Sequence, residues 1–199
     1  AVQDEADALP DEHVLVTGIG RVNAAAAVTR AIIAADQPVS GVVNIGIAGA
    51  LPDGGLAIGD LIVGRASVYA EEGLITPSGF QTMDEMGFTL GPVTSNALTP
   101  PTAWLDALRD AQQGSIATVA TCSGTNDAAV QVAARTGACA EAMEGAAVLH
   151  AAALAGVPAV EIINWNFIAA FSIGIAITWV VTGLAGRFFF KDDLIVTHR

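Results

Sequence analysis

Apolar stretches alternate with helical stretches along residues 13–163 of the chain. The apolar stretches lack the polar alternation of half-exposed strands, which is typical of strands buried on both faces of a sheet. The expected strands are 13–18, 39–51, 60–70, 114–121 and 157–163, and the expected helices are 22–35, 102–110, 127–136 and 144–155. Buried strands that are each followed by a helix predict an α/β fold, with a mainly parallel or mixed sheet sandwiched by helices.

Two regions depart from this regular pattern. Residues 60–70 form either a strand pair or one strand bent at Gly64, because glycine inside a strand marks a bend or a bulge. Residues 71–101 are rich in proline and glycine and are expected to be irregular. A loop of this length inside a compact domain is more often functional than not.

The pattern changes after Ile162, and no charged residue follows until Arg187. Residues 167–186 are mostly apolar, over about the length that spans a bilayer. A transmembrane helix with a cytoplasmic C-terminus and a buried core helix of a soluble domain are both open interpretations. We therefore expect three parts, which are an acidic lead-in at 1–12, an α/β domain at 13–163, and a divergent hydrophobic segment and tail at 164–199.

The charge of the chain narrows the class of partner. The chain carries 8 basic and 20 acidic side chains, a formal net charge of −12. Phosphate backbones are bound by clustered Lys and Arg, so this balance excludes nucleic acid and favours a small neutral or zwitterionic substrate. Cys122 and Cys139 have neither metal-ligand spacing nor the density of a disulfide scaffold. We expect two reduced, buried thiols in a cytoplasmic protein.

Glycines at the ends of two predicted strands are the first candidates for a binding site. TGIGR at 17–21 and NIGIAGAL at 44–51 place glycine where ligands approach the backbone in open α/β sheets. The first motif lacks the third glycine and the acid of a dinucleotide fingerprint, which excludes a dinucleotide cofactor. No HExxH, CxxC, P-loop or GxSxG motif occurs, so we expect neither a metal nor a cofactor. His13, His150 and His198 are expected to be core or surface histidines.

Taken in order, five motifs resemble the nucleoside phosphorylase and nucleosidase superfamily. They are VTGIGRVNAAAA (16–27), VVNIGIAGALPDGGLAIGDLIV (42–63), ITPSGFQTMDEMGF (75–88), TCSGT (121–125) and AEAMEGAAVLHAAALAGVPAVEI (140–162). The GFQTMDEMGF and AEAMEG segments are most similar to the futalosine hydrolases of menaquinone biosynthesis. The resemblance implies a nucleoside phosphorylase-like fold, a small-molecule nucleoside substrate and a homo-oligomer.

The resemblance also implies a ribose site at Met143 and Glu144. In the family this Met packs on the ribose and this Glu holds the ribose hydroxyls, whereas Glu141 is expected to lie outside the pocket. One carboxylate at the start of a helix can accept two hydroxyl bonds with charge assistance. Those bonds strengthen as the sugar approaches an oxocarbenium ion. The alternative for Glu144 is a plain N-terminal helix acid favoured by the helix dipole.

Further positions match the family's binding loops. The ribose turn corresponds to Ile47, Ala48 and Gly49, and the base loop to Ser123, Gly124 and Thr125, with Asn126. The loop 75–88 is expected to cover the pocket. There Phe80 or Phe88 either contacts the substituent on the base side or pins the loop to the core.

Two parts of the family pattern are missing or replaced in this chain. Family members begin with a strand whose Glu positions the water, and residues 1–12 contain no hydrophobic strand. After VPAVEI the family continues into an Arg and a Ser-Asn or Ser-Asp that faces the leaving base, whereas this chain reads EIINWNFIAAF. Asn166 is the catalytic candidate in that segment. General acid–base help contributes about 10²–10⁴-fold per group, so activity depends on both ends of the chain.

The resemblance therefore implies a nucleosidase that hydrolyses the N-glycosidic bond of futalosine and releases hypoxanthine. Three alternatives stay open. One is a methylthioadenosine/adenosylhomocysteine nucleosidase. Another is a nucleoside phosphorylase, for which Arg21 and Arg65 are the candidate phosphate ligands. The last is a catalytically incomplete, membrane-associated fusion of this fold.

Overall fold

A computed structural model of the chain describes residues 14–164 and 194–197. The expected lead-in at 1–12, the apolar segment at 167–186 and the candidate Asn166 lie outside the described residues. So do His13 and His198. In the part of the chain that is described, no helix has the length and apolar character needed to cross a membrane.

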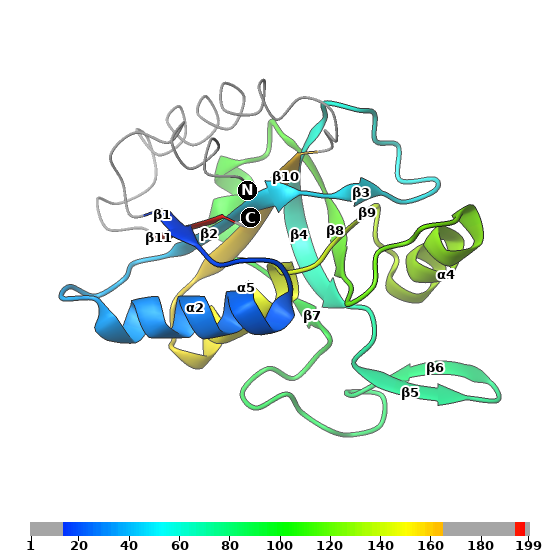
Figure 1. Cartoon of the computed structure of the whole chain (residues 1–199), viewed down its shortest axis with the longest axis horizontal. Helices are drawn as coiled ribbons and strands as arrows, with labels where there is room; N and C mark the ends of the chain where they lie inside the picture. Colours follow the sequence, from blue (N-terminus) through cyan, green and yellow to red (C-terminus); the bar gives the residue numbers. More distant parts are fainter. Residues whose placement is uncertain (1–13, 165–193, 198–199) are drawn as a thin grey trace.

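One mixed sheet forms the centre of the described structure (Figure 1). Its strands, in spatial order, are β1 (Val14–Val16), β11 (Leu194–Thr197), β2 (Val42–Ile47), β10 (Ala159–Asn164), β4 (Leu61–Tyr69), β8 (Gln112–Thr118), β9 (Ala140–Ala142) and β3 (Gly49–Ala50), with β7 (Ala97–Leu98) added on β4. The first four are parallel, as are β4, β8 and β9, and the two groups meet in the antiparallel pair β10–β4. The predicted mainly parallel or mixed sheet is therefore confirmed.

Helices cover both faces of this sheet. They are α2 (Arg21–Ala34), α3 (Thr102–Ala107), α4 (Asn126–Thr136) and α5 (Gly145–Leu154). Helices α2 and α5 lie side by side (Figure 1), and their small side chains pack together with Val42 and Ala159. The neighbouring strand residues Val43 and Val160 pack instead with Trp104 of α3. Adjacent residues of one strand thus serve opposite faces, which produces the predicted sandwich.

The structure refines the expected strand boundaries. Residues 60–70 form one strand, and its register to β8 shifts between Gly64 and Ala66, as a glycine bulge requires. The single run expected at 39–51 is divided at Ala48 into β2 and β3, which pair with different partners.

The segment 71–101 contains more regular structure than the sequence predicted. It contains a hairpin of β5 (Gly73–Thr76) and β6 (Gly79–Thr82), as well as β7. The expectation of a wholly irregular loop was therefore wrong. Proline and glycine mark the turns of this segment, and they conceal the short strands between them.

Helix α5 is the most deeply buried helix of the described chain, which leads to a stability prediction. Replacing Val148, which is fully buried, with alanine should lower the free energy of unfolding by about 2 kcal/mol, because a cavity is left in the core. The matched change Leu154→Ala, at a side chain that is 61% exposed, should cost less than about 0.5 kcal/mol. Urea unfolding of both variants measures the difference, and equal losses would contradict the assigned burial.

Candidate functional site

The turn between β1 and α2 supplies backbone donors at one end of the sheet. Gly18 and Gly20 have φ angles of 84° and 94°, in the left-handed region that glycine adopts without strain. This conformation allows the Gly20 amide to donate a hydrogen bond of 2.8 Å to Glu144 Oε1. The turn and the predicted ribose carboxylate are therefore in direct contact.

Glu144 occupies the N-cap position of α5, although its side chain makes no capping hydrogen bond to that helix, and it is only 6% exposed. Its Oε2 also accepts a hydrogen bond of 3.2 Å from the Met143 amide. Desolvation raises the pKa of Glu144, and the bonds from the Gly20 and Met143 amides partly oppose that shift. Thr118 Oγ1 accepts a bond of 2.8 Å from the Ala146 amide and fixes the first turn of α5 beside it.

The predicted ribose turn lies beside β9, the strand that leads to this carboxylate. Gly49 pairs with Glu141 across the β3–β9 contact, three residues before Glu144. Ile47, at the end of β2, is 47% exposed, and Ala48 packs against a small apolar cluster. Met143 packs with the buried residues between β8 and α4. The structure thus pairs the predicted ribose turn with β9, the strand that leads to Met143 and Glu144.

The predicted base loop is held by Glu141, which the sequence analysis expected to lie outside the pocket. Glu141 is 6% exposed and accepts hydrogen bonds from both the amide and the hydroxyl of Ser123, at 2.7 and 2.8 Å. Thr125 ends the loop by capping α4, because its Oγ1 accepts from the Ala128 amide at 3.2 Å. Gly124 and Cys122 of this loop are exposed. The expectation that Cys122 is a buried thiol was wrong, since it lies on a surface loop.

Phe80 ties the hairpin to α4. It is half-buried on β6, and the guanidinium carbon of Arg135 lies 5.0 Å from its ring centroid. Phe88, in contrast, is 60% exposed. A contact of either ring with the base side of a substrate stays a prediction.

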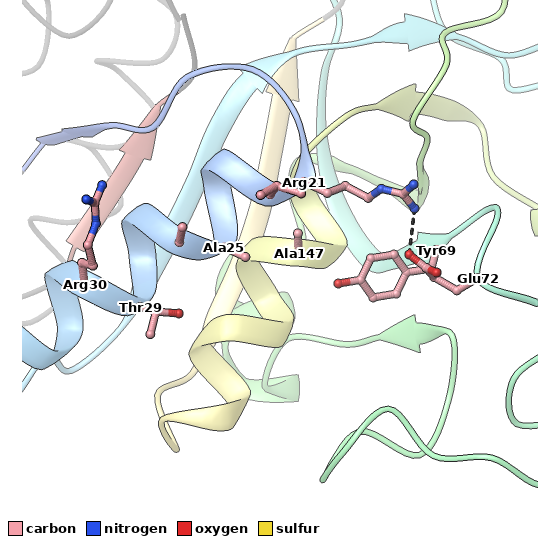
Figure 2. Close-up of a pocket in the computed structure, with 9 residues that line it drawn as sticks. Arg21, Ala25, Thr29, Arg30, Tyr69, Glu72 and Ala147 are labelled. Carbon is pink, nitrogen blue, oxygen red and sulfur yellow. Dashed lines mark hydrogen bonds and ion pairs between the residues drawn. The ribbon is translucent and has the colours of Figure 1, made fainter.

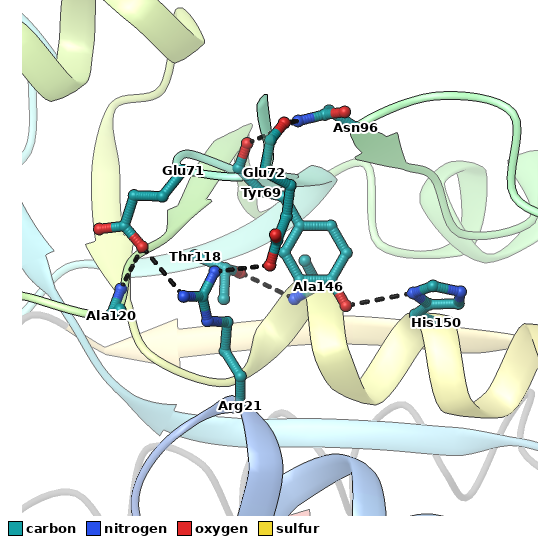
Figure 3. A network of polar contacts seen from close by, with 9 residues as sticks. All are labelled: Arg21, Tyr69, Glu71, Glu72, Asn96, Thr118, Ala120, Ala146 and His150. Atoms are coloured by element: carbon teal, nitrogen blue, oxygen red, sulfur yellow. Dashed lines mark hydrogen bonds and ion pairs between the residues drawn. The ribbon is translucent and has the colours of Figure 1, made fainter. Parts of the chain in front are cut away.

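Arg21 lies at the start of α2 and is paired with two carboxylates (Figure 3). Its guanidinium is 3.2 Å from Glu71 and 2.9 Å from Glu72. Glu71 also accepts a bond of 2.7 Å from the Ala120 amide. This network joins the glycine turn to the strand ends at 71 and 120. Arg65, the other candidate phosphate ligand, is an exposed residue of β4.

Asn96 links the start and the end of the excursion between β4 and β7, which contains the hairpin. It is 3% exposed, and its amide donates to the carbonyls of Tyr69 and Glu72 at 3.2 and 2.6 Å. Its carbonyl oxygen accepts from the Met83 amide at 3.2 Å. The two ends of the excursion are thereby held together.

The imidazole ring of His150 has a protein partner at each of its two nitrogens. One ring nitrogen lies 3.2 Å from the Tyr69 hydroxyl and the other 2.9 Å from the Leu90 carbonyl oxygen. Burial raises the pKa of Tyr69 to about 12, with a further contribution from the Glu72 charge, and the Arg21 charge opposes it. His150 is therefore a half-buried histidine with a protein partner at each ring nitrogen.

A groove of about 860 Å³ lies beside Arg21 (Figure 2). It is lined by Val22, Ala25, Ala26, Thr29 and Arg30 of α2, by Tyr69 and Glu72, and by Ala147 of α5. Neither Glu144 nor residues 47–49 line it, so this groove is separate from the predicted ribose site. Within residues 14–164 and 194–197, no group of three or more His, Cys, Asp and Glu side chains could hold a metal ion.

Glu161 is a further buried carboxyl group, besides Glu141 and Glu144, and the sequence analysis assigned it no role. It is fully buried on β10 and accepts hydrogen bonds from Ser67 Oγ at 2.5 Å and Asn44 Nδ2 at 3.2 Å. Desolvation is the largest cause that raises the pKa of Glu161 to about 7, and the Glu144 charge adds to it. The bonds from Ser67 and Asn44 oppose this shift.

Comparison with known proteins gives this arrangement a family. The sequence profile of the phosphorylase superfamily matches residues 11–163. The chain belongs to that superfamily. It is 36% identical over 160 residues to a futalosine hydrolase of Streptomyces coelicolor, and 39% identical over 123 residues to one of Acidothermus cellulolyticus. These matches cover 77% and 58% of this chain, which spans only 66% and 48% of the lengths of the two relatives.

Solved structures establish the same fold. A mutant of the futalosine hydrolase of Helicobacter pylori strain 26695 aligns with a TM-score of 0.70 at 20% identity, covering 86% of this chain and 78% of that one. A methylthioadenosine/adenosylhomocysteine nucleosidase from Colwellia psychrerythraea, in complex with adenine, aligns with a TM-score of 0.66 at 23% identity, covering 89% and 78%. The fold that the motifs implied is confirmed.

The raised pKa of Glu161 predicts how stability depends on pH. A folded-state pKa of about 7, above the ordinary 4.5, means that the native protein retains a proton that the unfolded chain releases. The stability that this group contributes is complete below pH 4.5 and is lost as the pH rises to about 7. Replacing Glu161 with glutamine should remove this decline, on the order of 1–3 kcal/mol.

Urea unfolding from pH 4.5 to 8 measures the effect as a difference between the wild type and Glu161→Gln. The control Val160→Ala removes a buried side chain of the same strand but no titrating group, so its pH slope should equal that of the wild type. A wild-type slope in Glu161→Gln would contradict the prediction.

Proposed function

We propose that this chain is a nucleosidase that hydrolyses the N-glycosidic bond of futalosine and releases hypoxanthine. The observation that carries the proposal is the buried Glu144 carboxylate at the start of α5, bonded to the Gly20 amide. The relatives at 36% and 39% identity, both futalosine hydrolases, support this choice of substrate.

The chemistry follows from the position of Glu144. A carboxylate offers about four lone-pair sites, so one group can accept bonds from backbone amides and from sugar hydroxyls. Its charge strengthens the bonds to the ribose hydroxyls as the sugar becomes an oxocarbenium ion, which lowers the barrier to departure of the base. The base would lie along Ser123, Gly124 and Thr125, in the loop held by Glu141.

The environment of Arg21 supports water rather than phosphate as the acceptor. Its charge is opposed by Glu71 and Glu72, so a phosphate at this turn would meet two carboxylates beside one cation. An anion needs an excess of positive charge or unpaired donors at its site. We therefore propose hydrolysis and not phosphorolysis.

As part of this proposal, we infer that the protein is a cytoplasmic homo-oligomer. The two cysteines, both free, suit a reducing compartment. Along and near α2 the apolar side chains of Ile19, Val22 and Ile33 are 59%, 82% and 78% exposed. Exposed apolar residues of this kind are commonly covered in protein interfaces.

An assay of purified protein with futalosine tests the function. We expect hypoxanthine release, detected by chromatography, at a rate that does not change when inorganic phosphate is added. Methylthioadenosine and adenosylhomocysteine are run in parallel and should be cleaved more slowly. Faster adenine release would favour the methylthioadenosine nucleosidase, and dependence on phosphate would favour a phosphorylase. No release at micromolar protein would favour the catalytically incomplete fusion.

Glu144 should contribute strongly to turnover. We expect Glu144→Gln to lower kcat/KM by about 10²-fold, because charge-assisted bonds to two hydroxyls are weakened. With a 2′,3′-dideoxy analogue of futalosine, which lacks those hydroxyls, Glu144→Gln should have nearly the same kcat/KM as the wild type. Asp110→Asn, at an exposed position outside the predicted site, serves as the control and should retain wild-type kcat/KM. Equal losses for the two variants would contradict the ribose role.

A further inference from the structure

Glu161 is held from both sides by the strands that flank β10. Ser67 of β4 and Asn44 of β2 donate to its two carboxyl oxygens, and β10 lies between those strands. The group is fully buried, and a buried carboxyl group is costly unless its oxygens are satisfied in this way. Its position is therefore fixed by three neighbouring strands.

The same carboxyl group touches the first residue of α5. A Cβ atom added at Gly145 would overlap both carboxyl oxygens of Glu161. Gly145 directly follows Glu144, so the buried group lies against the turn that carries the ribose carboxylate. The charge of Glu144 also contributes to the raised pKa of Glu161, in keeping with this placement.

We propose that Glu161 is a positioning residue for Glu144. Its carboxyl group supports the Glu144–Gly145 turn from beneath and thereby aims the Glu144 carboxylate at the Gly20 amide and at the ribose. This inference rests on the proposed nucleoside function for its ligand. The part that concerns the position of Glu144 can be measured without any ligand.

The ligand-free measurement follows the Gly20 amide, whose hydrogen bond to Glu144 reports where that carboxylate lies. In ¹⁵N-labelled protein, Glu161→Ala should shift the Gly20 amide proton upfield and speed its exchange with solvent, as should Glu144→Ala, which removes the acceptor of that bond. Glu161→Gln retains the shape and an acceptor oxygen, so it should leave the signal near its wild-type position. Val160→Ala removes a buried side chain that packs on the other face of β10 and should not move it.

The ligand measurement compares inosine with 2′,3′-dideoxyinosine by calorimetry. Wild-type protein should prefer inosine by about 10- to 100-fold, the range for charge-assisted bonds to the two hydroxyls. Glu161→Ala should reduce that ratio to within about threefold of the ratio for Glu144→Gln. Glu161→Gln and Val160→Ala should retain the wild-type ratio.

The outcomes separate the two proposals. Wild-type protein that binds neither nucleoside would overturn the nucleoside function, while the Gly20 signal would still decide the role of Glu161. An unchanged Gly20 signal in folded Glu161→Ala would overturn the positioning role. If Glu161→Ala does not fold, Ser67→Ala removes one of the two bonds to Glu161 and should shift the Gly20 signal part of the way. No shift in that variant would likewise overturn the proposal.

Discussion

The hydrogen bond from the Gly20 amide to Glu144 is the contact on which the candidate site depends. It joins residues 124 positions apart and connects the turn before α2 to the start of α5. A carboxylate that is 6% exposed is stable only when donors replace the water it has lost. The packing of α2 against α5 supports this bond, because it brings the N-termini of the two helices to the same end of the sheet. The position of the Glu144 carboxylate is thus a product of the fold rather than of a local motif.

Other carboxylates around the site also bind backbone amides, so part of the acidic composition has a structural role. Glu141 accepts from the Ser123 amide, and Glu71 accepts from the Ala120 amide. In each case a carboxylate fixes a loop at the end of a strand by binding its backbone. Bonds of this kind are stronger than neutral ones because the acceptor is charged. Acidic side chains therefore serve here as anchors for loops, in a chain whose net charge of −12 gave no sign of that role.

The sequence predicted the helices and strands better than the side-chain contacts between them. Buried strands and the helices that follow them have clear periodicity, and the bend at Gly64 could be inferred from one glycine. The hairpin at 73–82 was missed, because its strands are short and mostly exposed and lack an apolar pattern. Met143 and Glu144 were singled out through a motif, and their role in binding ribose stays a prediction. Glu141 and Glu161 were given no role, because their partners Ser123, Ser67 and Asn44 are distant in sequence.

Glu161 and Gly145 constrain each other in a way that neither shows alone. Any side chain at Gly145 would occupy the volume of the Glu161 carboxyl group, and a shorter residue at 161 would leave the Ser67 and Asn44 donors without that acceptor. The glycine after Glu144 is therefore required by a residue on β10 and not by its own backbone angle, since its φ is not positive. The carboxyl group of Glu161 fills the space beneath the Glu144–Gly145 turn. In the proposed function, this filling restricts the orientation of the carboxylate that would bind the ribose.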